Sequence, residues 1–112
     1  MDAVRIVNEE MAVISTEKTL DNNNAHEMAA LVAKAQREGY KFIVIDMGDL
    51  EFLASAGVGS ILGSVEVARG MGGDIVLCSA SEKILHVLEV LDLVEYLTIK
   101  NDVAEAETCC VH

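Results

Sequence analysis

The amino-acid sequence predicts an α/β fold: one domain with a mixed, mostly parallel sheet of about four to five strands and about four helices. Two observations favour this class. Short apolar runs typical of strands alternate along the chain with segments whose apolar residues recur with helical period. In addition, 52% of the 112 residues are hydrophobic and none is proline, so the chain can bury an aliphatic core.

The first third of the chain predicts two paired strands and a helix. Residues 4–7 and 11–15 have strand character, and the short turn between them predicts antiparallel pairing. Residues 21–24 offer several N-cap side chains for a helix, and Gly39 stands where a C-cap glycine belongs. The apolar face of this helix would consist of Ala25, Met28, Leu31, Val32 and Ala35.

A buried strand and a second helix occupy the middle of the chain. Residues 40–47 are almost continuously apolar, as expected for a strand covered on both faces. A helix should begin near Ser55 and end at the glycine-rich segment 70–73. Its buried stripe would consist of Val58, Ile61, Leu62, Val65 and Ala68.

The last third predicts two strands and two more helices. Residues 75–78 form a short apolar strand, and residues 96–99 are the last strand candidate. Residues 79–82 and 102–105 both have capping-box spacing. The first box should start an amphipathic helix through 84–91, and the second a short acidic helix.

No repeat or linker divides the sequence, so we expect one domain over residues 1–108 and a disordered tail over 109–112. Cys109, Cys110 and His112 fall short of a four-ligand metal site within one chain, so no metal site is expected. Cys78 lies within a strand and reads as a core residue. Three cysteines do not make a disulfide framework.

Charge and hydropathy exclude several classes of partner. A net charge of −11 argues against nucleic acids and anionic membrane surfaces, which are bound through clustered Lys and Arg. No apolar run approaches the roughly 18–20 residues of a membrane span. The first residues lack the basic and then apolar order of a signal peptide, so a cytoplasmic location is expected.

Residues 52–60, Phe-Leu-Ala-Ser-Ala-Gly-Val-Gly-Ser, form the candidate functional segment. They join the most apolar strand to the next helix, at the carboxyl ends of strands where open α/β sheets place their sites. Asp21 is expected at the same edge. Small neighbours leave the Ser55 hydroxyl uncovered, so it could be an N-cap that accepts from Gly57 or Val58, a nucleophile, or a phosphate acceptor.

Nucleophile and nucleotide motifs fit this segment poorly. In the nucleophile elbow G-x-S-x-G, Gly57 matches the second glycine, but Leu53 occupies the place of the first. His26 and His86 both fall on predicted helices, and nothing in the pattern turns either one toward Ser55. The lysine and spacing of a phosphate-binding P-loop are absent, so no nucleotide cofactor is expected.

A phosphate on Ser55 fits the physics of the segment better. Free amides and the dipole at a helix start favour an anion. Phosphoserine adds roughly −1.5 to −2 charges at pH 7. The added charge would fall near Asp46, Asp49 and Glu51, and would repel a partner that docks on this acidic edge. Phosphorylation would therefore act as a switch.

Residues 45–59, Ile-Asp-Met-Gly-Asp-Leu-Glu-Phe-Leu-Ala-Ser-Ala-Gly-Val-Gly, resemble the signature of STAS domains, the sulfate-transporter and anti-sigma-factor-antagonist family. The family pattern runs from a strand through Asp-Leu-Ser and Phe-Ile-Asp-Ser-Ser/Ala-Gly-Leu-Gly into a helix. The segment is most similar to the stand-alone antagonists. The likeness extends over nearly the whole chain, including the acidic turn around Asp21 and the glycine turn at 72–73.

The resemblance implies a protein-binding regulatory module and not an enzyme. In the family, the unphosphorylated antagonist binds an anti-sigma factor that is also a serine kinase, and so frees the sigma factor. The kinase phosphorylates the motif serine, which breaks the complex, and a PP2C-type phosphatase restores it. Carried over, Ser55 is the phosphorylation site. The partner-binding residues are then Asp21, Asp49, Ala54, Ser55, Gly57 and Val58.

Two positions depart from the family pattern. The aspartate before the motif serine is Ala54 here, and Glu17 and Lys18 replace a glycine that commonly precedes the Asp21 region. These differences keep two alternatives open: a STAS scaffold that binds without phosphorylation, and a sensor of a small ligand or nucleotide. A small serine hydrolase is the remote alternative.

Overall fold

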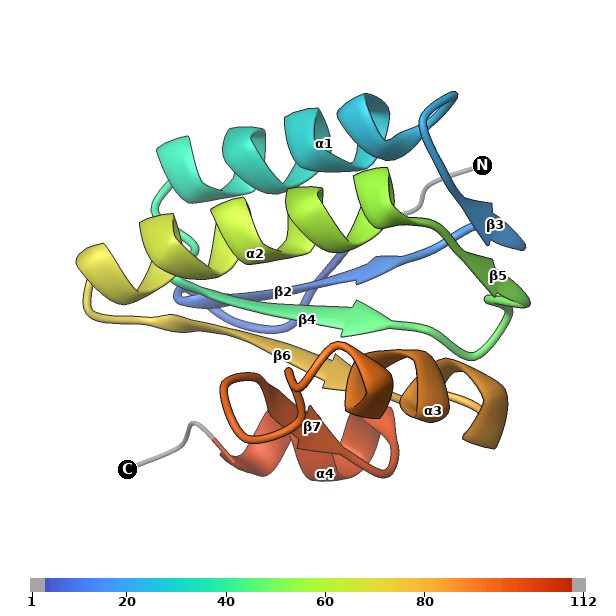
Figure 1. The fold of residues 1–112 in the computed structure, drawn as a ribbon. Coiled ribbons are helices and arrows are strands. Elements are labelled where there is room, and N and C mark those ends of the chain that lie inside the picture. Colours follow the sequence, from blue (N-terminus) through green and yellow to red (C-terminus); the bar gives the residue numbers. More distant parts are fainter. Residues whose placement is uncertain (1–3, 110–112) are drawn as a thin grey trace.

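The computed structural model describes residues 4–109 and contains a central five-stranded sheet flanked by helices (Figure 1). The strands in spatial order are β1 (Val4–Ile6), β2 (Met11–Ser15), β4 (Phe42–Asp46), β6 (Asp74–Cys78) and β7 (Thr98–Lys100). The helices are α1 (Ala25–Arg37), α2 (Ser55–Gly70), α3 (Glu82–Val90) and α4 (Val103–Cys109). The predicted fold class is confirmed.

The sheet is parallel except at one edge. β1 pairs antiparallel with β2, and the other three pairings are parallel. Val13, Val44 and Val76 are neighbours in register across the centre of the sheet, and all three are buried. The nearly continuous apolar run of the middle segment therefore forms a strand covered on both faces, as predicted.

Each face of the sheet has its own core. On one face, Val32 of α1 and Val65 of α2 pack with Ile43 of β4 in a large apolar cluster, which Ile84 of α3 also joins. On the other face, Ala106 of α4 packs on a smaller cluster that includes Val44 and Val76. Figure 1 shows α1 and α2 lying together over the sheet with α4 on its far side. This packing holds the first turn of α2 at the carboxyl edge of the sheet.

Several predicted boundaries need correction. α3 is capped by Ser81, whose Oγ accepts from the Ile84 amide at 3.3 Å, and not by Ser79. Ser79 instead has a φ of +60° and lies in the connection from β6 to α3, where its amide donates to the carbonyl of Asn101, the residue after β7. That strand begins two residues later than predicted, because the chain through Leu97 is still turning.

The final helix follows the prediction more closely. Asp102 caps α4, because its Oδ1 accepts from the Glu105 amide at 2.8 Å. α4 continues to Cys109, the first residue of the range expected to form a tail. The rest of the expected tail, residues 110–112 with Cys110 and His112, lies outside the described residues. Cys78 is fully buried in β6, as predicted for a core residue.

A second, two-stranded sheet was not predicted. β3 (Thr19–Leu20) pairs in parallel with β5 (Phe52–Leu53), with Leu20 opposite Leu53. We call this the β3–β5 sheet. Two residues are too few to show a strand period, and both segments were expected to be loops. The β3–β5 sheet lies beyond β2 and β4 at the carboxyl edge (Figure 1).

Within residues 4–109, no helix combines the length and apolarity needed to cross a membrane.

Candidate functional site

Ser55 is the first residue of α2, and its side chain is exposed. The N-cap residue is Ala54, which has extended backbone angles (φ −96°, ψ 169°) and no side-chain oxygen with which to cap. Within the described part of the chain, the Ser55 hydroxyl makes no hydrogen bond. The interpretation of Ser55 as the helix N-cap is therefore wrong, because the helix begins one residue too early for it.

The first turn of α2 leaves amide donors unpaired. Val58 is the first residue of this turn whose amide bonds within it, to the Ala54 carbonyl at 3.1 Å. The amides of Ser55, Ala56 and Gly57 have no acceptor among residues 4–109, as is usual at a helix start. The first turn also contains no acidic residue to offset the helix dipole. The helix start is therefore electrostatically suited to an anion next to the Ser55 hydroxyl.

The β3–β5 sheet brings Asp21 next to this helix start. Leu20 and Leu53 are partners in register, so the residues that follow them, Asp21 and Ala54, leave the sheet side by side. The Ala54 amide donates to the Leu20 carbonyl at 2.9 Å, which closes this junction. Asp21 was predicted at this edge, and the pairing of β3 with β5 is the reason that it lies there.

Local hydrogen bonds fix the turn around Asp21. Its Oδ1 accepts from the Asn23 amide at 2.9 Å, and its carbonyl accepts from the Ala25 amide at 2.8 Å. Asn24 accepts from the Asp21 amide and donates to both Glu17 and the Thr19 carbonyl. Asn24 thus braces the turn before α1, although its side chain does not cap that helix.

Gly57 allows α2 to approach the β3–β5 sheet closely. A Cβ atom at this position would lie 2.7 Å from the Leu20 carbonyl oxygen, 2.8 Å from Leu20 Cγ and 3.0 Å from Leu53 Cδ1. Gly57 is itself buried, so it contributes to the packing of α2 on the β3–β5 sheet and not to the exposed surface of the site. Val58, 7% exposed, is the next residue and faces the cavity described below.

A largely apolar cavity of about 250 Å³ opens beside Ser55, between the start of α2 and the outer face of α3. We call it the Ser55 groove. It is lined by Leu53, Ala54, Ser55, Val58, His86, Val87, Val90 and Leu91. Val90 and Leu91 are 70% and 48% exposed, so their apolar surface continues from the groove onto the outside of the protein. Exposed apolar surface of this kind is typical of binding sites.

The α3 wall of the Ser55 groove was not predicted. Leu91 was predicted as the last residue of an amphipathic helix through 84–91, and it is the exposed C-cap residue of α3. His86 was predicted on a helix surface with no sign of facing Ser55; it is exposed and lines the same groove as Ser55. A helix of nine residues does not show in its sequence which strand or helix it will face.

The acidic connection between β4 and β5 precedes the site in the chain. Asp49 is exposed in this connection, while the half-buried Asp46 accepts from the Gly48 amide at 2.9 Å through its Oδ1. The Glu51 amide donates to the Lys18 carbonyl at 2.7 Å, which ties the connection to the segment before β3. The predicted acidic residues thus border the strand that leads directly to Ser55.

Catalytic chemistry gains little support from this geometry. A serine nucleophile needs a base within hydrogen-bonding distance and a third group that orients the base. Among the described residues, His86 donates no hydrogen bond to Ser55 and has no carboxylate partner. Burial raises the pKa of the Cys78 thiol to about 11, so this cysteine stays a neutral core residue.

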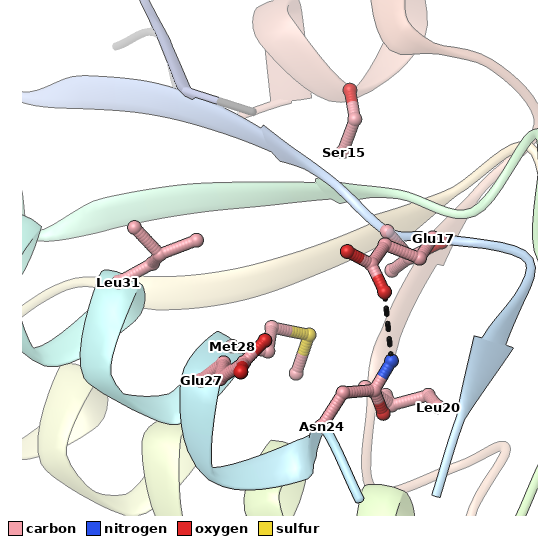
Figure 2. Close-up of a pocket in the computed structure, with 8 residues that line it drawn as sticks. Ser15, Glu17, Leu20, Asn24, Glu27, Met28 and Leu31 are labelled. Atoms are coloured by element: carbon pink, nitrogen blue, oxygen red, sulfur yellow. Dashed lines mark hydrogen bonds between the residues drawn. The ribbon is translucent and has the colours of Figure 1, made fainter. Parts of the chain in front are cut away.

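A second, smaller pocket of about 70 Å³ lies between β2 and the first turns of α1 (Figure 2). Leu20, Met28 and Leu31 supply apolar walls, and Glu17 and Glu27 stand at its edge. Figure 2 shows the hydrogen bond from Asn24 to Glu17 spanning one side. This volume is that of a few water molecules. The Ser55 groove is therefore the better candidate for a binding site.

Together, the mixed sheet, the exposed serine at a helix start and the adjoining apolar groove describe a small α/β domain with a candidate binding surface. A sequence model of the STAS domain matches residues 3–106. The chain therefore belongs to the STAS domain family, as its resemblance to that family implied.

Relatives and solved structures extend this assignment. The putative anti-sigma factor antagonist BtrV of Bordetella bronchiseptica is 28% identical over 89 residues, which cover 80% of this chain and 74% of BtrV. The crystal structure of TM1081, a putative anti-sigma factor antagonist of Thermotoga maritima, superposes with a TM-score of 0.86 at 27% identity, covering 93% of this chain and 89% of TM1081. SpoIIAA, a Bacillus cell fate determinant solved in its phosphorylated form, shares the fold with a TM-score of 0.72 at 21% identity, covering 93% and 95% of the two chains.

Proposed function

We propose that this chain is an anti-sigma factor antagonist, a regulatory binding module and not an enzyme. In its unphosphorylated form it binds an anti-sigma factor that is also a serine kinase. The kinase transfers the γ-phosphoryl group of ATP to Ser55 Oγ, ADP leaves, and the complex dissociates. A PP2C-type phosphatase hydrolyses the phosphate and restores binding. The similarity to BtrV and TM1081, both putative anti-sigma factor antagonists, supports the role as an antagonist.

The single observation that carries the proposal is the unengaged hydroxyl of Ser55 at the start of α2. The hydroxyl is exposed, so a kinase can reach it without unfolding the helix. The adjacent amides have no acceptor among residues 4–109, so they are free to receive phosphate oxygens. A phosphate at this position gains hydrogen bonds from the folded protein instead of disrupting it.

The surroundings of Ser55 support a docking surface for a partner protein. The Ser55 groove and the exposed side chains of Val90 and Leu91 provide apolar contact area. Asp21 lies beside Ala54, and the exposed Asp49 lies in the connection that precedes β5; both carboxylates favour a partner with basic side chains. A phosphate on Ser55 adds negative charge at the centre of this surface, which would repel the same partner.

The test combines affinity capture with phosphate mapping. The anti-sigma factor captured by the unphosphorylated chain is incubated with ATP, and the phosphate is located by mass spectrometry. We expect one phosphate, on Ser55, that is absent from Ser55→Ala. Ser60→Ala is the matched control on the same helix, because the Ser60 hydroxyl is already bonded to the Ala25 carbonyl at 3.2 Å. It should be phosphorylated like the unchanged chain.

Binding measurements complete the test. Phosphoserine incorporated at position 55 should weaken binding to the anti-sigma factor by at least about tenfold, which corresponds to about 1.4 kcal/mol. Equal affinities of the phosphorylated and unphosphorylated chains would contradict the switch. Loss of binding in both Ser55→Ala and Ser60→Ala would instead show damage to the helix.

A small-ligand sensor is the second candidate, and the Ser55 groove favours it. Its volume of about 250 Å³ approaches that of small-molecule sites, and unpaired amides lie beside it. In this case, an anionic ligand would bind without phosphorylation of Ser55. Partner binding would then be unaffected by ATP and would change when such a ligand is added.

A further inference from the structure

We propose that His86 of α3 binds the phosphoryl group on Ser55, so that the phosphorylated side chain bridges α2 and α3 across the Ser55 groove. This inference rests on the proposed function in one respect, the presence of a phosphate on Ser55. It adds a residue of α3 to a site that the family motif places only on the segment around the serine.

The geometry that carries the inference is the shared cavity. Ser55 and His86 approach the Ser55 groove from different helices, and the other six lining residues are apolar. A water molecule occupies about 30 Å³ of liquid, so a cavity of about 250 Å³ has room for a phosphoryl group without movement of either wall. A phosphate on Ser55 that enters the groove therefore meets one polar side chain, the His86 imidazole.

The chemistry of the phosphate and the imidazole favours the same contact. Phosphoserine loses its second proton near pH 6, in the range where histidine gains or loses its charge. The imidazole can therefore donate a charge-assisted hydrogen bond to the phosphate. Lys83 and the acidic Glu82 and Glu89 lie within one turn of His86 on α3, and Glu51 precedes β5. None of these four residues lines the groove. Among residues 4–109, His86 is therefore the one lining residue with a side chain that titrates near neutral pH.

The contact changes how phosphorylation would end partner binding. A phosphoryl group held between the first turn of α2 and His86 fills the recess that an apolar side chain of a partner would enter. The switched-off state then results from occupation of the Ser55 groove as well as from charge repulsion. Replacement of His86 should therefore reduce the ratio of the partner affinity of the unphosphorylated chain to that of the phosphorylated chain, with both forms carrying the same substitution.

The experiment measures the titration of the phosphate directly. Phosphoserine is incorporated at position 55 during synthesis, so the measurement does not depend on any kinase. The ³¹P resonance is followed from pH 4 to 8 in the unchanged chain and in His86→Gln. A cationic imidazole favours the dianion, so we expect the titration midpoint to rise by about 0.3–0.7 pH units in His86→Gln.

Two further variants make the result specific. His86→Lys keeps a cation at the position and should hold the midpoint at or below that of the unchanged chain. His26→Gln removes the other histidine of the described chain, which lies on α1 away from the groove lining, and should leave the midpoint unchanged. Equal midpoints in the unchanged chain and His86→Gln would overturn the inference. Failure of the kinase to phosphorylate Ser55 would refute the proposed function without affecting this measurement.

Discussion

At the scale of single residues, Ala54 determines how the start of α2 can be used. A serine or aspartate N-cap would accept a hydrogen bond from one first-turn amide and compete with an incoming anion for it. Ala54 cannot accept, so the amides remain available for phosphate oxygens. The departure from the family aspartate thus lowers the stability of the helix start and leaves more donors for a phosphate on Ser55.

This argument predicts that Ala54→Ser stabilises the protein. The extended backbone of Ala54 is that of an N-cap residue, so a serine hydroxyl can accept from the amide of Ala56 or Gly57. The free energy of unfolding, measured by urea denaturation, should rise by about 0.5–1.5 kcal/mol.

Ser81→Ala is the matched control for a lost cap. Ser81 caps α3 through its bond from the Ile84 amide, so its replacement should lower the free energy of unfolding by about 0.5–1.5 kcal/mol. If Ser81→Ala destabilises the protein and Ala54→Ser leaves it unchanged, the start of α2 is not an uncapped helix end.

At the scale of elements, the β3–β5 sheet assembles the site. It joins segments that are more than thirty positions apart through the register of Leu20 with Leu53. The sheet sets Asp21 beside Ala54, and it provides the floor on which the first turn of α2 rests. The contact between this floor and Gly57 allows no Cβ atom, so the position of Ser55 depends on a glycine two residues away.

The effect of a methyl group at two glycines of α2 tests this packing. Gly57→Ala should lower the free energy of unfolding by about 1–3 kcal/mol, because backbone and Leu20 must move to admit the Cβ atom. Gly59→Ala is the control two residues further on, where a Cβ atom has nothing within 4 Å. It should stabilise the helix by about 0.5–1 kcal/mol.

Both variants would be compared by urea denaturation, and amide NMR shifts around Ser55 would report local movement. Equal effects of Gly57→Ala and Gly59→Ala on stability would contradict close packing of α2 on the β3–β5 sheet.

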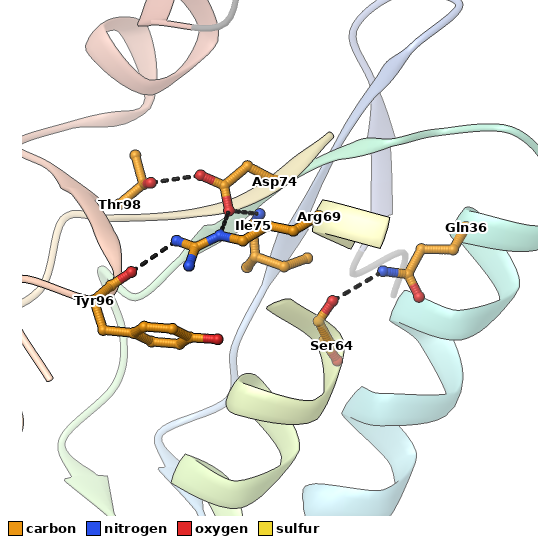
Figure 3. Close-up of polar contacts among 7 residues, drawn as sticks. All are labelled: Gln36, Ser64, Arg69, Asp74, Ile75, Tyr96 and Thr98. Atoms are coloured by element: carbon orange, nitrogen blue, oxygen red, sulfur yellow. Dashed lines mark hydrogen bonds and ion pairs between the residues drawn. The ribbon is translucent and has the colours of Figure 1, made fainter. Parts of the chain in front are cut away.

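At the scale of the whole molecule, polar contacts hold the end of α2 opposite to Ser55. Arg69 donates to Asp74 Oδ1 at 3.1 Å and to the Tyr96 carbonyl at 2.7 Å, and its guanidinium lies 4.6 Å from the centre of the Tyr96 ring (Figure 3). Asp74 also accepts from the Ile75 amide and the Thr98 hydroxyl. These contacts join α2 to β6, β7 and the turn before β7, so the helix is anchored at both ends.

We predict that Arg69→Lys weakens this anchor. Lysine lacks the planar group that reaches Asp74 and Tyr96 together and stacks on the ring. Because Arg69 is partly exposed, the expected loss in free energy of unfolding is modest, about 1 kcal/mol. Arg37→Lys, in the last turn of α1, is the control and should change stability by less than about 0.5 kcal/mol. Equal small effects in both variants would show that the Arg69 contacts contribute no stability.

Elements with local signals could be predicted from the sequence. The apolar run of β4, the periodic stripe of α2, and Gly39, with its φ of +101° just after α1, appear where their patterns predict them. The stripe of α1 does so too, except that Leu31 was predicted on the apolar face and is exposed. Backbone periodicity and near neighbours decide such features. The position of Ser55 at a helix start was predictable for the same reason.

The contacts between distant residues become visible in the folded structure. The pairing of β3 with β5 sets Asp21 beside Ala54, and the packing of α3 brings His86 into the cavity beside Ser55. It also showed that Ala54, one residue before Ser55, is the N-cap. The first two features depend on contacts between segments far apart in the chain, and the third depends on the position of a helix start to within one residue. The periodic pattern of apolar residues contains neither kind of information.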